Sequence, residues 1–185
     1  SEPNVINPIY MTWDERGRLW VVESVDYPNE FKGGRKGNDR IEICEDTNGD
    51  GRADKFTVFA EGFNMPTSMA FARGGVILAH APDFYFLKDT DGDDKADIRE
   101  VLFTGWGVGD THAGPSNLRY GFDNWIYGTV GYARFNGTIN GEIDQGGRSE
   151  DETQPGDGLY VTGDYNAGPN ASLTMPHPYW KHSIG

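Results

Sequence analysis

Two short acidic stretches hold the side chains best suited to chemistry, "DTNGDGRAD" at residues 46–54 and "DTDGDDKAD" at residues 89–97. Each stretch offers oxygen atoms at every second position. In the first they come from Asp46, Asn48, Asp50, the carbonyl of Arg52 and Asp54, and in the second from Asp89, Asp91, Asp93, the carbonyl of Lys95 and Asp97. This spacing is that of a calcium-binding loop, and calcium takes roughly six to eight oxygen ligands. The sequence therefore predicts two calcium sites.

Neither acidic stretch is a complete EF-hand loop. The first has Gly51 at position 6 but Thr57 at position 12, whereas the second has Glu100 at position 12 but Asp94 at position 6. Aspartate can adopt the left-handed conformation that glycine normally supplies there, so we expect both loops to bind, with unequal affinity and in a structural role. The alternative is a pair of metal-free Asx turns at hairpin tips.

The surrounding sequence contains three similar segments. They begin roughly 50 residues apart, a period typical of β-propeller blades, and they read "MTWDERGRLWVVES" from Met11, "MAFARGGVILAHA" from Met69 and "LRYGFDNWIYGTVG" from Leu118. Each alternates apolar and polar residues on both sides of a turn containing Gly or Asn, which predicts a β-hairpin.

The acidic stretches lie at equivalent places after the first two hairpins. "RIEIC" precedes the first and "KFTVFAEG" follows it, while "DFYFL" and "IREVLFTGW" flank the second. Each repeat therefore predicts a four-stranded antiparallel meander, with the acidic stretch as the turn between its last two strands. We expect an all-β chain with almost no helix, folded as a partial β-propeller of about three to four blades; an ordinary antiparallel sandwich is the alternative.

The whole chain, residues 1–185, reads as a single domain in which the polar, Gly-rich stretch 136–158 is a loop or insertion. "GLYVTGDY" after it is a further candidate strand, and "MPHPYWKHSIG" reads as an extended segment. Because a propeller closes with typically 4 to 8 blades, we expect this one to be incomplete. A fragment, a truncated relative, and a chain that assembles with other copies remain open.

Composition excludes several functional classes. The chain has 16 Lys and Arg residues against 29 Asp and Glu residues, a formal net charge of −13, which disfavours nucleic acid as a partner. The sequence contains no apolar run of about 18 or more residues, the length that would predict a transmembrane helix. We therefore expect a soluble chain. The single cysteine, Cys44, excludes an internal disulfide and Cys-rich metal sites, and is expected to be a small buried residue at a strand end.

Catalytic chemistry has one candidate segment, "GWGVGDTHAGPSNLRYGFDNWIYGTVGY" at residues 105–132. His112 could act as a general base near neutral pH, with Asp110 orienting it. The alternative is a loop histidine that hydrogen-bonds a backbone carbonyl. His80, His177 and His182 are weaker candidates. No nucleophile elbow, phosphate-binding loop, dinucleotide fingerprint or HExxH zinc motif is present.

The segments "MTWDERGRLWVVESVDYPN", "DTNGDGRAD", "APDFYFLKDTDGDDKADIREVLFTGWG" and "DTHAGPSNLRYGFDNWIYGTVG" resemble the membrane-bound dehydrogenase-type β-propeller domain of planctomycetes and their relatives. The resemblance extends from about Asn7 to Tyr132. That domain is similar to the soluble glucose and sorbosone dehydrogenases, which are six-bladed propellers that use pyrroloquinoline quinone and calcium. The resemblance implies that His112 is the base that deprotonates the sugar hydroxyl, with Arg119 and Tyr132 as nearby site candidates.

Two functions follow as expectations. The first is a periplasmic or extracellular sugar or small-alcohol dehydrogenase, which by resemblance would pass electrons to a haem c domain or protein. The second is a non-catalytic, calcium-dependent module that binds carbohydrate or protein, or serves in assembly, through exposed aromatic residues such as Trp106, Trp125 and Trp180.

Overall fold

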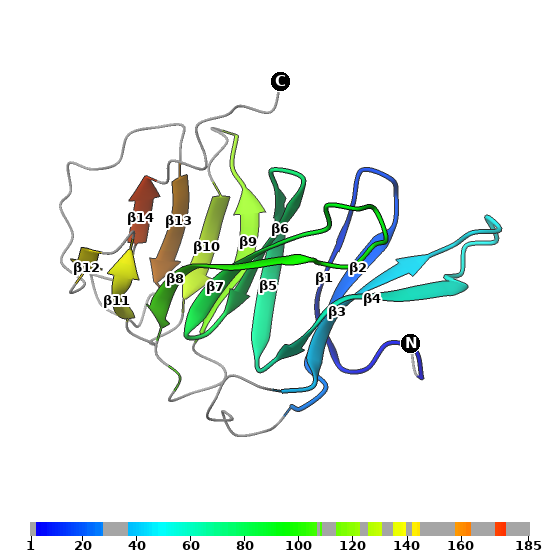
Figure 1. Ribbon diagram of the computed structural model, residues 1–185, viewed down its shortest axis with the longest axis horizontal. Helices are drawn as coiled ribbons and strands as arrows, with labels where there is room; N and C mark the ends of the chain where they lie inside the picture. Colours follow the sequence, from blue (N-terminus) through cyan, green and yellow to red (C-terminus); the bar gives the residue numbers. More distant parts are fainter. Residues whose placement is uncertain are drawn as a thin grey trace.

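The computed structural model describes residues 3–27, 37–106, 108, 114–122 and 126–130, together with the strands at 135–139, 142–144, 158–163 and 173–176. Within these residues the chain forms 14 strands and no helix (Figure 1). It follows that no described segment is a helix able to cross a membrane. The strands assemble into three sheets.

The first sheet is an antiparallel meander in the order β1-β2-β3-β4. Its strands are β1 (Pro8–Trp13), β2 (Leu19–Glu23), β3 (Asp39–Glu45) and β4 (Lys55–Phe63). The turn after β1 is tight because the carboxylate of Asp14 accepts the backbone N–H groups of Arg16 (2.9 Å) and Arg18 (2.8 Å). Gly17 adopts a positive φ of 76° there, which suits glycine.

The second sheet begins with the same meander. Its strands are β5 (Pro66–Ala72), β6 (Gly75–His80), β7 (Asp83–Lys88) and β8 (Ile98–Trp106), and β11 (Phe135–Ile139) and β12 (Glu142–Asp144) extend it beyond β8. The stretch 136–158, which we predicted as a loop or insertion, therefore includes most of β11 and all of β12. The open edge of β8 provides the backbone groups with which β11 pairs.

The third sheet departs from the meander. It has the order β14-β13-β10-β9, with β9 (Pro115–Tyr120), β10 (Ile126–Val130), β13 (Gly158–Gly163) and β14 (Leu173–Pro176). Strands β9 and β10 form the predicted hairpin, but β13 lies parallel to β10. The candidate strand in "GLYVTGDY" is confirmed as β13.

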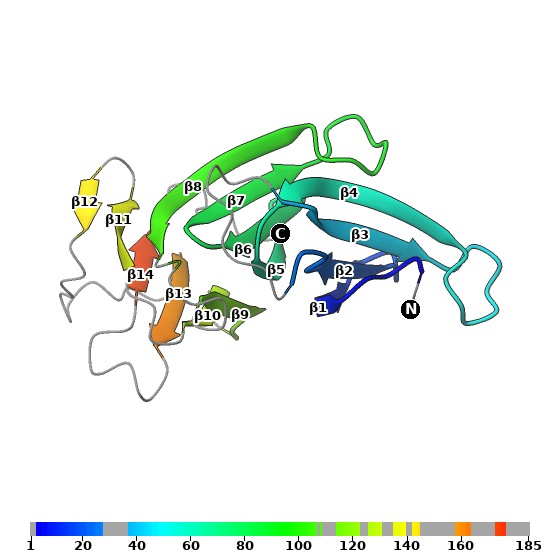
Figure 2. The ribbon, with the colours of Figure 1, turned by 90° about the horizontal axis from the view of Figure 1, so that it is seen from below.

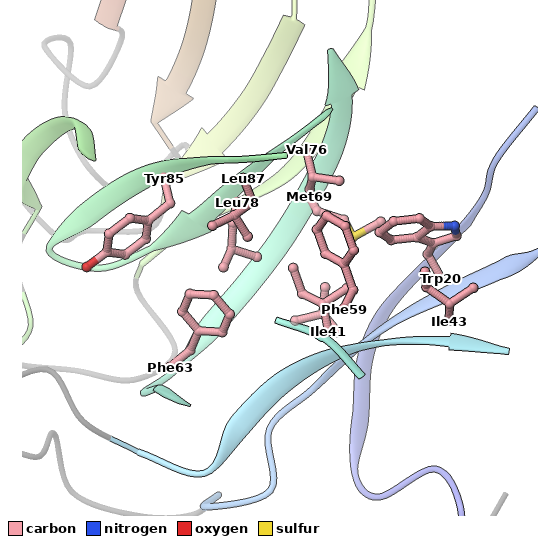
Figure 3. Packing of buried hydrophobic residues seen from close by; sticks show 11 residues of the cluster. Trp20, Ile41, Ile43, Phe59, Phe63, Met69, Val76, Leu78, Tyr85 and Leu87 are labelled. Atoms are coloured by element: carbon pink, nitrogen blue, oxygen red, sulfur yellow. The ribbon is translucent and has the colours of Figure 1, made fainter. Parts of the chain in front are cut away.

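The three sheets are layered, and the second sheet lies between the other two (Figure 2). One hydrophobic core lies between the first and second sheets, where Trp20, Ile41 and Phe59 pack against Met69 and Leu78 (Figure 3). A second core joins the opposite face of the second sheet, through Ile77 and Phe84, to Leu118 and Ile126 of the third sheet. The second sheet is thus apolar on both faces.

The predicted hairpins are all present, as are the strands on both sides of each acidic stretch. The all-β class is therefore confirmed, whereas the described sheets do not close into a ring. Cys44 is 4% exposed near the end of β3, as expected.

Candidate metal centres

The first acidic loop (46–54) joins β3 to β4 and folds around Asp46. One carboxylate oxygen of Asp46 accepts the backbone N–H of Gly49 (2.7 Å) and the other accepts that of Gly51 (2.7 Å). At the end of the loop, the carboxylate of Asp54 accepts both the backbone N–H (3.0 Å) and the hydroxyl of Thr47 (2.9 Å). These bonds hold the loop in a compact turn whose carboxylates remain at the surface.

The second acidic loop (89–97) joins β7 to β8 and repeats this pattern residue for residue. Asp89 accepts the backbone N–H groups of Gly92 (2.7 Å) and Asp94 (2.9 Å). Asp97 accepts the backbone N–H (2.7 Å) and the hydroxyl (2.9 Å) of Thr90. The two loops are therefore the same structural unit at the same place in two successive meanders.

Backbone conformation is shared as well. Gly49 and Gly92, at position 4, have φ values of 77° and 85°. At position 6, Gly51 has a φ of 85° and Asp94 has a φ of 64°. Asp94 therefore adopts the left-handed conformation that we predicted for it, at an energetic cost that a glycine would not have.

Three carboxylates converge in the second loop. Ligand atoms of Asp89, Asp91 and Asp97 all lie within 4.8 Å of one another, and they occupy positions 1, 3 and 9. Asp93, a predicted ligand, is not part of this group, and its carboxylate instead accepts the backbone N–H of Lys95 (2.9 Å). Among the described side chains of His, Cys, Asp and Glu, this is the one group of three with such a spacing.

The equivalent positions of the first loop hold Asp46, Asn48 and Asp54. Asn48 replaces one carboxylate by an amide oxygen, so the first loop has one negative charge fewer at these positions. Asp50 resembles Asp93, since its carboxylate accepts the backbone N–H of Arg52 (2.9 Å). Both donor sets consist of hard oxygen atoms, which fit calcium better than a soft transition metal.

Electrostatics keep the central carboxylates charged. Backbone N–H groups, foremost that of Gly51, hold the pKa of the Asp46 carboxyl below its ordinary value. The N–H of Gly92 does the same most strongly for the pKa of Asp89. Both carboxylates are therefore ionised at neutral pH and available to a cation.

The second loop also contacts the first sheet. Asp94 forms an ion pair with Arg18 (2.8 Å), and Arg18 is bound on its other side by Asp14 (2.8 Å). In addition, the backbone N–H of Ala96 donates to the carbonyl of Phe59 in β4 (2.8 Å). The first loop has Gly51 in place of Asp94 and so lacks this carboxylate.

The predicted catalytic residues are only partly located. His112 and Asp110 lie outside the described residues, as do Tyr132, Trp125, Trp180, His177 and His182. Arg119 lies on β9 and is exposed. The arrangement of the proposed base and its partners therefore stays a prediction.

The structure decides one prediction for a tryptophan, Trp106, and one for a histidine, His80. Trp106, which we expected to be an exposed binding residue, is only 3% exposed, because its ring packs against Phe84 (5.9 Å between ring centroids) in the second core. That prediction is wrong. His80 is fully buried, and its Nε2 accepts the backbone N–H of Asn64 (2.9 Å), which is a structural role.

Sequence reasoning missed a buried carboxyl pair on the first sheet. Glu23 on β2 and Glu42 on β3 are 0% and 4% exposed, and Arg40 pairs with Glu23 at 2.5 Å. Burial, followed by the neighbouring Glu23 carboxyl, raises the pKa of Glu42 to about 7. The signal was present in the sequence, because a charged residue in the apolar strands "LWVVE" and "DRIEICE" is unusual at a buried position.

Comparison with known proteins gives a family but no characterised relative. The family model of a domain of unknown function, DUF7133, matches residues 1–157. No curated protein and no solved structure matches the chain. The matched range contains both acidic loops, the first sheet and all of the second sheet. Because the match covers most of its length, the chain belongs to the DUF7133 family.

Proposed function

We propose that this chain is a calcium-binding module whose two acidic loops are structural metal sites. The observation that carries the proposal is the convergence of Asp89, Asp91 and Asp97 within 4.8 Å, in a loop whose hydrogen bonds are repeated in residues 46–54. Bound calcium would neutralise carboxylates that otherwise repel one another. The protein's own contribution is to hold those carboxylates at the tip of a β-hairpin.

The sheets support a partial β-propeller as the arrangement that these loops stabilise. Two successive four-stranded meanders pack face to face, and the second is apolar on both faces. A two-layered sandwich buries only one face of each sheet, whereas a propeller places every sheet between two neighbours. The parallel pairing of β10 and β13 is a departure from the propeller pattern in the third sheet.

Calorimetric titration with calcium tests the metal sites. We expect two bound ions, one lost in Asp97→Asn and the other in Asp54→Asn, because each change removes a charged ligand. Glu61→Gln is the matched control, since Glu61 is an exposed carboxylate on β4 and belongs to neither acidic loop. An ion at about 100 times its dissociation constant stabilises a protein by about 2.7 kcal/mol, so chelation should lower the melting temperature. No heat of binding and an unchanged melting temperature would refute the proposal.

The sequence resemblance supports a second proposal, that the protein is an oxidoreductase acting on sugars or small alcohols with pyrroloquinoline quinone. When bound, the quinone would accept the hydride. In this proposal His112 takes the hydroxyl proton, Asp110 orients His112, and the exposed Arg119 is available to a carboxylate. Electrons would pass to a haem c domain or protein, in the periplasm or outside the cell.

Titration of the protein with pyrroloquinoline quinone, in the presence of calcium, distinguishes the enzyme from a non-catalytic carbohydrate- or protein-binding module. If the protein is the enzyme, the absorbance of the quinone should change on binding, and addition of sugar should reduce a dye. The His112→Asn variant should abolish the dye reduction. Binding of sugar or protein to the calcium-loaded chain, without quinone binding, would instead support the non-catalytic module. Trp106 is no longer a candidate contact in that module, because it is buried.

A further inference from the structure

The second acidic loop differs from the first at position 6, where it carries a strained residue. Asp94 has a φ of 64°, in the left-handed region, whereas the first loop has Gly51 there with a φ of 85°. A side chain in this conformation crowds its own backbone, and glycine avoids that strain. Such a conformation persists when contacts from the surrounding structure hold it in place.

The backbone at position 6 matters because its N–H reaches the first carboxylate of each loop. The N–H of Asp94 donates to Oδ2 of Asp89 (2.9 Å), and the N–H of Gly51 donates to Oδ2 of Asp46 (2.7 Å). If residue 94 left the left-handed conformation, the peptide plane that carries its N–H would turn. The carboxylate at position 1 would then lose a hydrogen bond that orients it.

Arg18 supplies the contact that holds Asp94. Its Nη1 donates to the Asp94 carboxylate (2.8 Å), and its Nε donates to Asp14 (2.8 Å). Asp14 is held in turn, because it also accepts the indole N–H of Trp20 (2.9 Å). The side chains of Arg18 and Asp14 are only 8% and 9% exposed, so water competes little for these bonds. The Asp94 carboxylate is thus attached to a well-packed part of the first sheet.

Two other cations near Asp94 are poorer anchors. Nη1 of Arg16 lies 3.9 Å and Nζ of Lys55 lies 4.0 Å from its carboxylate. Both side chains are largely exposed, so solvent screens these pairs. Loss of Arg18 should therefore free residue 94, whereas loss of Arg16 should not.

We propose that Arg18 is a positioning residue for the second calcium site and raises the calcium affinity of that loop without touching the ion. Arg18 holds the Asp94 side chain, this contact maintains the left-handed backbone, and the N–H of residue 94 orients Asp89. Without Arg18 the loop would populate its binding-competent conformation less, and the apparent dissociation constant for calcium would rise in proportion. By linkage, an ion bound there strengthens the contact between the first and second sheets. The inference rests on the calcium sites proposed above.

Calorimetric titration of one-site variants measures the calcium affinity of each loop separately. Asp54→Asn leaves the second site for measurement, and Asp97→Asn leaves the first. Arg18→Met should raise the dissociation constant of the second loop about tenfold, because its left-handed residue loses the anchor. The first loop should keep its affinity, because Gly51 needs no anchor, and Arg16→Met is the matched control at the second loop. Charge alone predicts the opposite, since removing a nearby cation would strengthen calcium binding.

Substitutions at position 94 separate backbone conformation from charge. Asp94→Gly and Asp94→Ala remove the same carboxylate, but only glycine adopts the left-handed conformation without strain. The second loop should therefore bind calcium about tenfold more weakly in Asp94→Ala than in Asp94→Gly. Both variants keep Arg18, so they decide the question even if Arg18→Met does not fold. Adding Asp94→Gly to Arg18→Met should restore most of the lost affinity.

The first loop offers the converse experiment. Gly51→Ala places a strained, unanchored residue at position 6, and the added Cβ would meet no heavy atom within 4 Å in the described structure. The substitution therefore adds strain without a clash. It should weaken calcium binding at the first loop about tenfold and leave the second loop unchanged.

Hydrogen exchange in the presence of a chelator tests the positioning step without calcium. Arg18→Met should accelerate exchange of the Asp94 amide and leave that of Gly51 unchanged. Absence of any bound ion in the wild type would overturn the calcium sites and this inference together. Two bound ions, with a second-loop affinity that Arg18→Met leaves unchanged or increases, would overturn only the positioning role of Arg18.

Discussion

Arg18 and Asp94, 76 residues apart in the chain, join two sheets through an ion pair of 2.8 Å. Arg18 follows the turn after β1, and Asp94 occupies position 6 of the second acidic loop. Their side chains are only 8% and 20% exposed. The aspartate that departs from the calcium-loop pattern is thus a contact between sheets, which the glycine at position 6 of the first loop could not make.

Replacing Arg18 should destabilise the fold. Arg18→Met keeps the aliphatic stem but leaves Asp14 and Asp94 without their shared cation, and losing one partner of such a pair costs about 1.5 to 3 kcal/mol. Arg16→Met is the control, because Arg16 is 61% exposed and 3.9 Å from Asp94, and exposed pairs contribute about 0 to 1 kcal/mol. Urea unfolding of both variants measures the difference. Equal losses would show that the buried position of Arg18 adds nothing.

Position 94 combines backbone strain with the ion pair, and two substitutions separate them. Asp94→Gly loses the pair but relieves the φ of 64°, whereas Asp94→Ala loses the pair and keeps the strain. We expect the Ala variant to be less stable by about 1 kcal/mol. With Arg18→Met already present, Asp94→Gly should become neutral or stabilising. The same destabilisation in both backgrounds would argue against coupling between the two residues.

Stability should depend on pH through Glu42. Burial, with the Glu23 carboxyl next, raises its pKa from an ordinary 4.5 to about 7, so the folded state binds this proton more tightly than the unfolded state. The contribution is complete below pH 4.5 and is lost as pH rises through 7. The free energy of unfolding should therefore fall by up to about 3 kcal/mol across that window.

Glu42→Gln isolates this effect because glutamine stays neutral. Urea unfolding at about pH 5 and about pH 8 should show a smaller fall in the variant than in the wild type. Glu15→Gln, at an exposed position of the turn after β1, should retain the wild-type pH dependence. A variant and wild type with parallel pH profiles would mean that Glu42 is ionised in both states.

Ser68 connects the second and third sheets. It is fully buried, and its Oγ accepts the backbone N–H of Leu118 on β9 (2.8 Å). Ser68→Ala leaves that N–H unpaired in the core, at a cost of about 1 to 3 kcal/mol. Hydrogen exchange of the Leu118 amide should accelerate. Ser116→Ala is the control, because Ser116 Oγ lies on the exposed side, 3.3 Å from Thr129 Oγ1. It should change the exchange rate of the Leu118 amide little.

Local patterns were sufficient to predict the strands. Residues such as Ile41 and Ile43 alternate with Glu42, and this period of two defines a strand whatever it packs against. The acidic turns were predictable for the same reason, since their Asx hydrogen bonds link residues no more than seven positions apart. The buried state of Trp106 was not predictable, because it depends on Phe84 of another strand.

By itself the sequence determined the all-β class, the hairpin repeat and the two acidic loops, because each rests on backbone propensity and hydrogen bonds between near neighbours. Tertiary structure alone decided that Asp94 reaches Arg18, that Glu23 and Glu42 share a buried site, and that Met11 stays exposed where Met69 is covered. Those outcomes depend on which sheet faces which, and packing between distant segments sets that arrangement.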